Sequence, residues 1–162
     1  MQLEAINISL TPVTNGSIVY STLVQGKGWQ PNSMNGQLSG TTGLAIPLEA
    51  ICINLTGDLA TIYDIYYRVH IGNYGWLDWA KNGAKAGSEG LALHLEAYEL
   101  MLLEKNSPIS FSTKNSFLSI LKPKLTYQTH VETIGWQNVI SEGNLAGTTG
   151  QNKQVEAIKL FF

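Results

Sequence analysis

The amino-acid sequence predicts an all-β protein in which three internal repeats close around a pseudo-threefold axis. Three observations support this prediction: short motifs recur at constant spacing, apolar and polar residues alternate within the repeated segments, and no segment has a clear helical period. We place the repeats at about residues 18–55, 63–102 and 125–162, within a single domain that spans residues 1–162. A chain of this length commonly forms one domain.

A constant series of motifs defines the repeats. Each repeat contains a Gly-Trp pair, and 14 residues after the tryptophan comes the last glycine of a Gly-[Thr/Ser]-[Thr/Glu]-Gly turn. A tyrosine precedes each tryptophan by 9 residues, and a glutamate follows each closing glycine by 6 residues. The tryptophans are Trp29, Trp76 and Trp136. Constant spacing without insertions or deletions indicates one structural unit in three copies.

Each repeat contains two segments with the periodicity of β-strands. After the Glu-Ala pair of the first repeat, Ile51, Ile53 and Leu55 share one face with Glu49, and polar residues occupy the other face. The segments that begin at the tyrosines alternate in the same way. A period of two with one apolar face is typical of a half-buried strand. Residues 91–104 have a composition that suits a helix, but their alignment with the other copies predicts a strand.

The size of one repeat limits the possible arrangements. A unit of two to four strands cannot bury its own apolar face, so three units must share a core. A β-prism of three sheets and a β-trefoil both satisfy this requirement, and we favour the prism. The reason is a fourth Leu-Glu-Ala strand at residues 3–10, which lies outside the repeats. We expect this strand to pair with the C-terminal strand, which would close the ring and hide strand edges.

One segment breaks the symmetry of the repeats. Residues 105–124 are an insertion before the third repeat. Apolar residues at 109–113 and 117–121 flank a Lys-Asn pair, and we expect them to form an added hairpin.

Composition and charge argue against several classes of function. Charged residues make up 14% of the chain and the net charge is -2, which provides no basic surface for nucleic acid. No apolar run reaches the roughly 18 residues that span a bilayer. The only cysteine, Cys52, cannot form an internal disulfide or a cysteine-based zinc site, and its apolar neighbours predict a buried structural thiol. The N-terminal residues do not have the pattern of a signal peptide.

The third repeat carries a set of motifs that resembles a known family. These motifs are Thr129-His130-Val131, Gly135-Trp136-Gln137, Ala146-Gly147-Thr148-Thr149-Gly150 and Glu156-Ala157-Ile158. The pattern is similar to the ChW repeat, the clostridial hydrophobic repeat with a conserved tryptophan, here in three tandem copies. The second copy departs from the family pattern at Ser88-Glu89, and the first has Leu23 in the histidine position. The family's second tryptophan is present only as Trp79.

The resemblance implies a non-catalytic module with a surface to bind. ChW repeats occur in secreted Gram-positive proteins and phage lysins, beside cell-wall hydrolases or adhesion modules. We therefore expect a lectin-like module, extracellular or associated with the cell wall, that recognises bacterial cell-wall or surface polysaccharide. Linked weak sites on three repeats would raise the avidity for a polymer.

Tryptophans and turn residues are the candidates for sugar binding. An indole face can stack on the C–H side of a pyranose ring, but the Gly-Trp tryptophans can also fill the shared core, which is the interpretation we favour for them. Trp79 occurs once and is the favoured exposed platform. The Gly-Thr-Thr-Gly turns offer hydroxyl and N–H groups, although their glycines also suit a structural turn. The candidates are Trp79, Trp29, Trp76, Trp136, Asn35, Asn82, Asp78, Thr41, Thr42, Ser88, Glu89, Thr148 and Thr149.

Four repeated glutamates are expected to have a structural role. They are Glu4, Glu49, Glu96 and Glu156, each at the end of an apolar strand face. A buried carboxylate must be hydrogen-bonded or paired. We expect each to accept hydrogen bonds from backbone N–H groups of the preceding turn or from the tryptophan indole.

The sequence predicts no catalytic, cofactor or metal site. It lacks a nucleophile elbow, a His-x-x-x-His motif and a phosphate-binding loop, and it shows no carboxylate pair suited to glycoside hydrolysis. His70 and His130 are expected on the outer strand face as solvated residues, with contact to a ligand or a pH response as the alternative. The alternative function is a protein-binding adhesion or assembly module that uses residues 105–124 to bind a partner or to self-associate.

Overall fold

A computed structural model describes residues 2–11, 15–120, 125–141 and 143–161. The protein is all-β, with 47% of residues in strands and 3% in a helix. Its contacts group into two compact units, residues 1–120 (unit 1) and 121–162 (unit 2). Within the described residues several sheets form and none closes into a barrel. The β-prism, the β-trefoil and the single closed domain therefore stay predictions.

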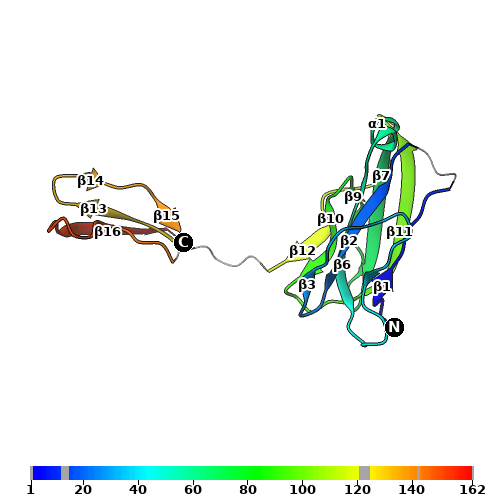
Figure 1. Ribbon diagram of the computed structural model, residues 1–162, viewed down its shortest axis with the longest axis horizontal. Coiled ribbons are helices and arrows are strands. Elements are labelled where there is room, and N and C mark those ends of the chain that lie inside the picture. Colours follow the sequence, from blue (N-terminus) through cyan, green and yellow to red (C-terminus); the bar gives the residue numbers. More distant parts are fainter. Residues whose placement is uncertain (1, 12–14, 121–124, 142, 162) are drawn as a thin grey trace. The chain divides into compact units, whose positions relative to one another are not determined.

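The helix and strands follow the motif order (Figure 1). Unit 1 contains β1 (Ala5–Ile6), β2 (Ile18–Val24), β3 (Gly28–Trp29), β4 (Ser33–Met34), β5 (Ser39–Gly40), β6 (Leu48–Leu55), α1 (Asp58–Ile62), β7 (Tyr63–Ile71), β8 (Gly75–Trp76), β9 (Ala80–Lys81), β10 (Lys85–Glu89), β11 (Leu95–Glu104) and β12 (Phe117–Ser119). Unit 2 contains β13 (Thr126–Val131), β14 (Gly135–Trp136), β15 (Ile140–Ser141) and β16 (Val155–Phe161). The five-residue helix α1 was not predicted by the periodicity.

Each repeat is built on the same antiparallel pair of long strands. The strand that contains the tyrosine pairs with the strand that contains Glu-Ala, as β2 with β6, β7 with β11 and β13 with β16. The register is the same in all three, with Tyr20 opposite Ile53, Tyr67 opposite Leu100 and Tyr127 opposite Leu160. A short strand with the Gly-Trp pair lies on the other edge of each tyrosine strand. The strands predicted within the three repeats, including the one within residues 91–104, are confirmed.

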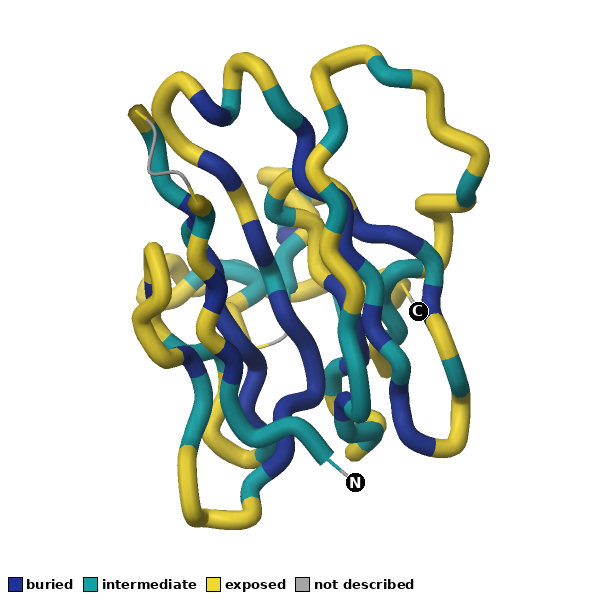
Figure 2. The backbone as a smooth tube through the Cα atoms, turned by 90° about the vertical axis from the view of Figure 1, so that its right-hand side faces the viewer, coloured by how far each residue is buried: buried dark blue, intermediate teal, exposed yellow. Residues whose placement is uncertain are grey.

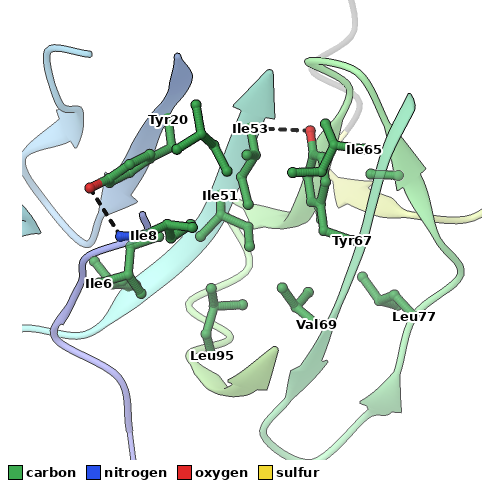
Figure 3. Packing of buried hydrophobic residues seen from close by; sticks show 14 of the residues in the cluster. Ile6, Ile8, Tyr20, Ile51, Ile53, Ile65, Tyr67, Val69, Leu77 and Leu95 are labelled. Carbon is green, nitrogen blue, oxygen red and sulfur yellow. Dashed lines mark hydrogen bonds between the residues drawn. The ribbon is translucent and has the colours of Figure 1, made fainter. Parts of the chain in front are cut away.

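The core of unit 1 combines the N-terminal segment with the first two repeats. Tyr20, Ile51, Tyr67, Val69 and Leu95 are at most 1% exposed and belong to one apolar cluster (Figure 3). Buried residues follow the long strands, whereas the connecting loops are exposed (Figure 2). The predicted alternation is seen in β7, where Tyr67 and Val69 are buried and Arg68 is half-buried, whereas consecutive residues of β2 and β6 are buried on both faces.

Within unit 1 the N-terminal strand pairs with the first repeat. β1 pairs antiparallel with β5, and within unit 2 β16 pairs with β13 of its own repeat. Gly40 presents no side chain to Ala5, so the backbones of β1 and β5 approach closely. The expected pairing between the N-terminal and C-terminal strands stays a prediction.

The insertion does not form the expected hairpin. Residues 109–113 contain no strand, and β12 pairs parallel with β10. Residues 121–124 lie outside the described residues. Phe111 packs on Trp79 and Tyr66, with ring centroids 5.1 and 5.2 Å apart. These apolar contacts, rather than pairing within the insertion, hold the segment on unit 1.

Candidate functional site

The third repeat brings a tryptophan, a histidine and a glutamate together on one sheet face. Trp136 on β14 lies opposite His130 on β13, and their rings meet edge to face with centroids 5.3 Å apart. His130 Nδ1 lies 2.9 Å from Glu156 Oε2 on β16. Trp136 remains 41% exposed. We name this set the Trp-His-Glu cluster.

The second repeat has the same cluster. Trp76 lies opposite His70, with ring centroids 5.5 Å apart and an interplanar angle of 82°. His70 Nδ1 lies 3.0 Å from Glu96 Oε2, and His94 Nε2 lies 3.4 Å from the other oxygen of the same carboxylate. Trp76 is also 41% exposed. In both repeats an equally exposed indole thus lies beside a histidine that contacts a glutamate.

A β-bulge places each glutamate beside its partner. In β16 the register shifts between Ala157, which faces His130, and Val155, which faces Val131, so Glu156 is the extra residue. The same shift occurs in β11 at Glu96 and in β6 at Glu49. A bulge re-aims a side chain out of the regular alternation. The bulge therefore turns the side chain of the repeated glutamate toward its partner.

A cation lies over the ring of every Gly-Trp tryptophan, but it comes from a different strand each time. Lys159 Nζ lies 4.2 Å from the centroid of Trp136 and Arg68 Cζ lies 4.7 Å from that of Trp76. In the first repeat Lys85 Nζ lies 5.1 Å from the centroid of Trp29. A cation within about 6 Å of an indole centroid is attracted by the ring. The three indoles are thus fixed from one side by charge.

The third repeat also forms a hollow next to its tryptophan. Its volume is about 420 Å³, and it is lined by Trp136, Gln137, Asn138, Ile140, Leu145 and Ala146. Gln137 Oε1 accepts hydrogen bonds from Gly147 N at 3.0 Å and Thr129 Oγ1 at 3.3 Å, which fixes its amide beside the hollow. The site therefore combines an aromatic face with two carboxamide side chains.

The comparison with protein families matches all three repeats. The family model described as clostridial hydrophobic W (ChW) matches residues 24–57, 70–104 and 130–160. The chain belongs to the ChW family. No curated protein and no solved structure matches the chain. The resemblance to three tandem ChW copies is confirmed, and the Trp-His-Glu cluster falls within the second and third matched ChW segments.

The first ChW repeat lacks the complete cluster. Leu23 occupies the histidine position and is buried, and Glu49 accepts instead from Gln25 Nε2 at 3.1 Å. Trp29 is half-buried, and its Nε1 has no hydrogen-bond partner among the described residues. Lys85 covers this indole because β10 of the second ChW repeat pairs with β6. The first repeat therefore offers a less accessible indole.

The exposure of the tryptophans is the reverse of what the sequence suggested. Trp76 and Trp136 are exposed, so the expectation that they fill the shared core is wrong. Trp79, the expected exposed platform, is only 9% exposed, because the Phe111 ring of the insertion packs on it. No sequence signal showed that a segment about thirty residues further along the chain covers Trp79.

Asp78 holds the insertion in place. Its carboxylate accepts hydrogen bonds from Ser112 Oγ at 2.7 Å and from Asn115 N at 3.0 Å. These bonds lower the pKa of Asp78. The Asp78 and Trp79 backbone N–H groups donate to the carbonyls of Asn115 and Ser112. Asp78 thus has a structural role in the second ChW repeat.

The two asparagine candidates also have structural partners. Asn35 Oδ1 accepts from Ile18 N at 3.2 Å, and Asn82 Oδ1 accepts from Ile65 N at 2.9 Å. Both have positive φ, 47° and 44°, as an Asn-Gly turn requires. These side chains cap the start of the tyrosine strand in their own repeats.

The turn candidates differ between the ChW repeats. Thr42 and Thr149 are exposed, while Thr41 and Thr148 are half-buried. Ser88 is fully buried and donates to the Leu93 carbonyl at 3.1 Å. Glu89 forms an ion pair with Lys85 at 3.2 Å. None of these turn residues lines the hollow beside Trp136.

The partners expected for three of the four repeated glutamates are wrong. We expected backbone N–H groups of the turn or the tryptophan indole to donate to these carboxylates, but Glu96 and Glu156 pair with histidines and Glu49 accepts from Gln25. Glu4 is half-buried, and its backbone carbonyl accepts from Thr41 N at 2.8 Å. The regular spacing of His and Glu in two repeats was the signal that could have found these pairs.

Cys52 and the described metal-ligating side chains do not form a further site. Cys52 is half-buried, its thiol donates to the Gly83 carbonyl at 3.0 Å, and burial raises its pKa. The described residues contain no group of three His, Cys, Asp or Glu side chains placed to hold a metal ion. In the same part of the chain, no helix is long and apolar enough to cross a membrane.

Proposed function

We propose that the protein is a non-catalytic carbohydrate-binding module that recognises bacterial cell-wall or surface polysaccharide. One observation carries the proposal. The indole of Trp136 is held by contacts with His130 and Lys159, is 41% exposed and lies beside a hollow of about 420 Å³. An exposed indole with a fixed orientation provides an apolar platform for the C–H face of a pyranose. The adjacent side chains supply the polar contacts that a sugar also needs.

The chemistry of the hollow suits hydroxyl-rich ligands. Carboxamides such as those of Gln137 and Asn138 both donate and accept hydrogen bonds, as sugar hydroxyls do. Ile140 and Leu145 add apolar surface to the same hollow. A concave site with an aromatic wall and a few fixed polar groups is the usual form of a small-ligand site.

Two of the three repeats carry an exposed Gly-Trp indole beside a histidine and a glutamate. Trp76 and Trp136 are equally exposed, whereas Trp29 is half-buried beneath Lys85. Two linked weak sites on one chain increase the apparent affinity for a polymer without any new contact. We therefore propose a polymeric ligand such as peptidoglycan or teichoic acid, and a location outside the cell or at its wall.

The insertion gives less support to a protein-binding role. Its central aromatic residue, Phe111, is used against Trp79 and Tyr66 of the same unit. Its polar residues Ser112 and Asn115 are used by Asp78. These side chains therefore have partners within unit 1, whereas Ile109 and Ile120 remain exposed, so a protein-binding role of the insertion stays the alternative proposal.

The test is sedimentation of the labelled full chain with purified Gram-positive cell walls, before and after removal of teichoic acids and protein. Trp136→Ala and Trp76→Ala should each weaken binding by about tenfold or more, and the double variant should abolish it, because avidity is lost. Phe161→Ala is the control, since Phe161 is also exposed in unit 2 but is not a member of the cluster. Unchanged binding of the double variant would contradict the proposal.

A further inference from the structure

We infer that a polar pocket in unit 1 binds an oxyanion, a phosphate or carboxylate group, through the ammonium group of Lys105. The pocket has a volume of about 170 Å³ and is lined by Asn54, Leu55, Ala60, Tyr63, Asn82 and Lys105. We name it the Lys105 pocket. It lies at the end of unit 1 that carries α1, where β6 ends and β7 begins (Figure 1). None of its lining residues belongs to a Trp-His-Glu cluster, so the inference does not depend on the proposed sugar sites.

A buried carboxylate gathers two lysines beside this pocket. Asp64, the second residue of β7, is only 5% exposed. Lys105 Nζ lies 2.6 Å from Asp64 Oδ1, and Lys81 Nζ lies 2.7 Å from Asp64 Oδ2. Two ammonium groups around one carboxylate leave one net positive charge on this cluster. Charges interact more strongly beside protein than in open water, so this excess charge favours an anion in the pocket.

The fold of the repeat does not require these charges. Asn82 Nδ2 donates to Asp64 Oδ1 at 2.7 Å, and in the first ChW repeat Asn35 Nδ2 donates to Ser17 Oγ at 3.0 Å. Ser17 and Asp64 both stand three residues before the tyrosine of their repeat, so a neutral hydroxyl is sufficient for this hydrogen bond. Buried ion pairs seldom add stability over uncharged residues. The charged cluster of the second repeat therefore favours a role beyond folding.

The two lysines differ in what they offer to a ligand. Lys81 does not line the pocket, and its Nζ also lies 5.3 Å from the ring centroid of Tyr66. Lys105 lines the pocket, and among the described residues its Nζ donates one hydrogen bond, to Asp64. An ammonium group has three N–H donors, so two remain for an anion. The backbone N–H of Lys105 donates to the Ile62 carbonyl at 2.8 Å, which fixes the residue beside α1.

The other lining residues suit an oxyanion on a polar carrier. Asn54 is exposed and Tyr63 is half-buried, and their carboxamide N–H and phenol O–H groups can donate to anion oxygens. The amide of Asn82 is already oriented by Ile65 N and Asp64. Among the residues that the structure describes, no carboxylate lines the pocket. A bound anion would thus meet hydrogen-bond donors and a cation without a like charge on the pocket wall.

The test is an NMR titration of the ¹⁵N-labelled full chain with inorganic phosphate and with acetate, at constant ionic strength. We expect saturable shifts of the amide signals of Asn54, Tyr63 and Lys105, with tighter binding of phosphate because it carries more charge. Lys105→Gln should weaken binding by at least about tenfold, since hydrogen bonds to charged groups are the strong ones. The titration does not involve the tryptophans, so its failure and the failure of the proposed function are separate results.

Lys81→Gln is the matched control. It also removes one ion pair of Asp64, but it leaves the pocket intact, so anion binding should stay within about threefold of wild type. Because both lysine variants lose one partner of the same carboxylate, a loss of stability common to them cannot produce a difference in binding. Melting temperatures of the two variants measure that common loss.

A third variant tests the pocket without changing the charged cluster. Asn54→Asp places a carboxylate among the lining residues and should abolish the saturable shifts by repulsion of the anion. No saturable shift with either anion, a loss in Lys81→Gln as large as that in Lys105→Gln, or unchanged binding in Asn54→Asp would each overturn the inference.

Cell-wall sedimentation distinguishes two sources of the anion. If the phosphate of teichoic acid is bound, Lys105→Gln should weaken binding to untreated walls but not to walls stripped of teichoic acids. If a carboxylate of peptidoglycan is bound, the variant should weaken binding to both preparations. An equal effect of Lys81→Gln in these experiments would contradict the role of the Lys105 ammonium.

Discussion

His130 Nδ1 and Glu156 Oε2 lie 2.9 Å apart, and the second repeat reproduces this pair as His70 and Glu96 at 3.0 Å. Each histidine also contacts the edge or face of the exposed tryptophan in its own repeat. A carboxylate on the bulge thereby fixes an imidazole, and the imidazole fixes an indole. The pair connects a strand irregularity to the orientation of the candidate sugar platform.

Replacing the histidine should weaken binding without unfolding the protein. His130→Leu copies the residue found at Leu23 in the first repeat, so it removes the contact with Glu156 while keeping a strand-compatible side chain. An exposed polar pair of this kind contributes about 0–1 kcal/mol to stability, so the melting temperature should change little. Cell-wall sedimentation should show lower affinity, because Trp136 loses its support.

The glutamate offers a control for this prediction. Glu156→Gln keeps an oxygen that can accept from the imidazole, whereas Glu156→Ala removes it. We expect the glutamine variant to bind better than the alanine variant. Equal binding of wild type and Glu156→Ala would show that the pair does not orient Trp136.

Removing the buried carboxylate of Glu49 should lower the free energy of unfolding far more than removing the exposed carboxylate of Glu156. Glu49 is 7% exposed and accepts from Gln25, so Glu49→Ala should destabilise unit 1 by about 1–3 kcal/mol, the cost of an orphaned buried group. The exposed Glu156 is the matched comparison, and Glu156→Ala should cost no more than about 0.5–1 kcal/mol. Urea unfolding measures both values. An equal loss in the two variants would contradict the role of burial.

Glycines that lie against a neighbouring strand should be far more sensitive to substitution than other glycines with positive φ. Gly87→Ala combines a φ of 128° with a Cβ only 2.3 Å from the Glu49 carbonyl oxygen. Gly26→Ala has a φ of 70° but meets no atom within 4 Å, so it carries only the backbone penalty of about 1 kcal/mol. Thermal unfolding should show a much larger drop for Gly87→Ala. Similar melting temperatures would mean that β6 and β10 do not approach as closely as described.

Acid should destabilise unit 1 through Asp64. Burial opposes the ionisation of this carboxyl, but hydrogen bonds from Lys105, Lys81 and Asn82 outweigh that effect and hold its pKa well below the usual range. Its folded pKa is lower than the unfolded value of about 3.9, so its contribution is complete above that pH and is lost as the pH falls below it. Melting temperatures between pH 7 and 2 should fall less steeply for Asp64→Asn. Parallel curves for the two proteins would refute this assignment.

The sequence by itself determined the repeat, the strand segments within each repeat and the family. Constant spacing aligned Tyr20, Tyr67 and Tyr127, and the alternation after each of them placed one strand face in the core, because a period of two leaves only that choice. The recurrence of tryptophan and glutamate at fixed positions also picked out Trp136 and Glu156 of the candidate site, but not the residues that line the hollow. These features depend on neighbouring residues or on recurring motifs, and both can be recognised from the spacing of residues in the sequence.

The tertiary structure decided which of these side chains are accessible. Trp79 is buried because Phe111 packs on it, and Trp136 is exposed because it lies on the outer face beside His130 and Lys159. Each repeated glutamate turns toward its partner because a bulge shifts the register of its strand, and the alternation alone does not reveal the extra residue. The N-terminal strand pairs with β5 because Gly40 lets the backbones meet. Exposure, bulges and strand partners depend on contacts between residues distant in the chain, so the tertiary structure alone establishes them.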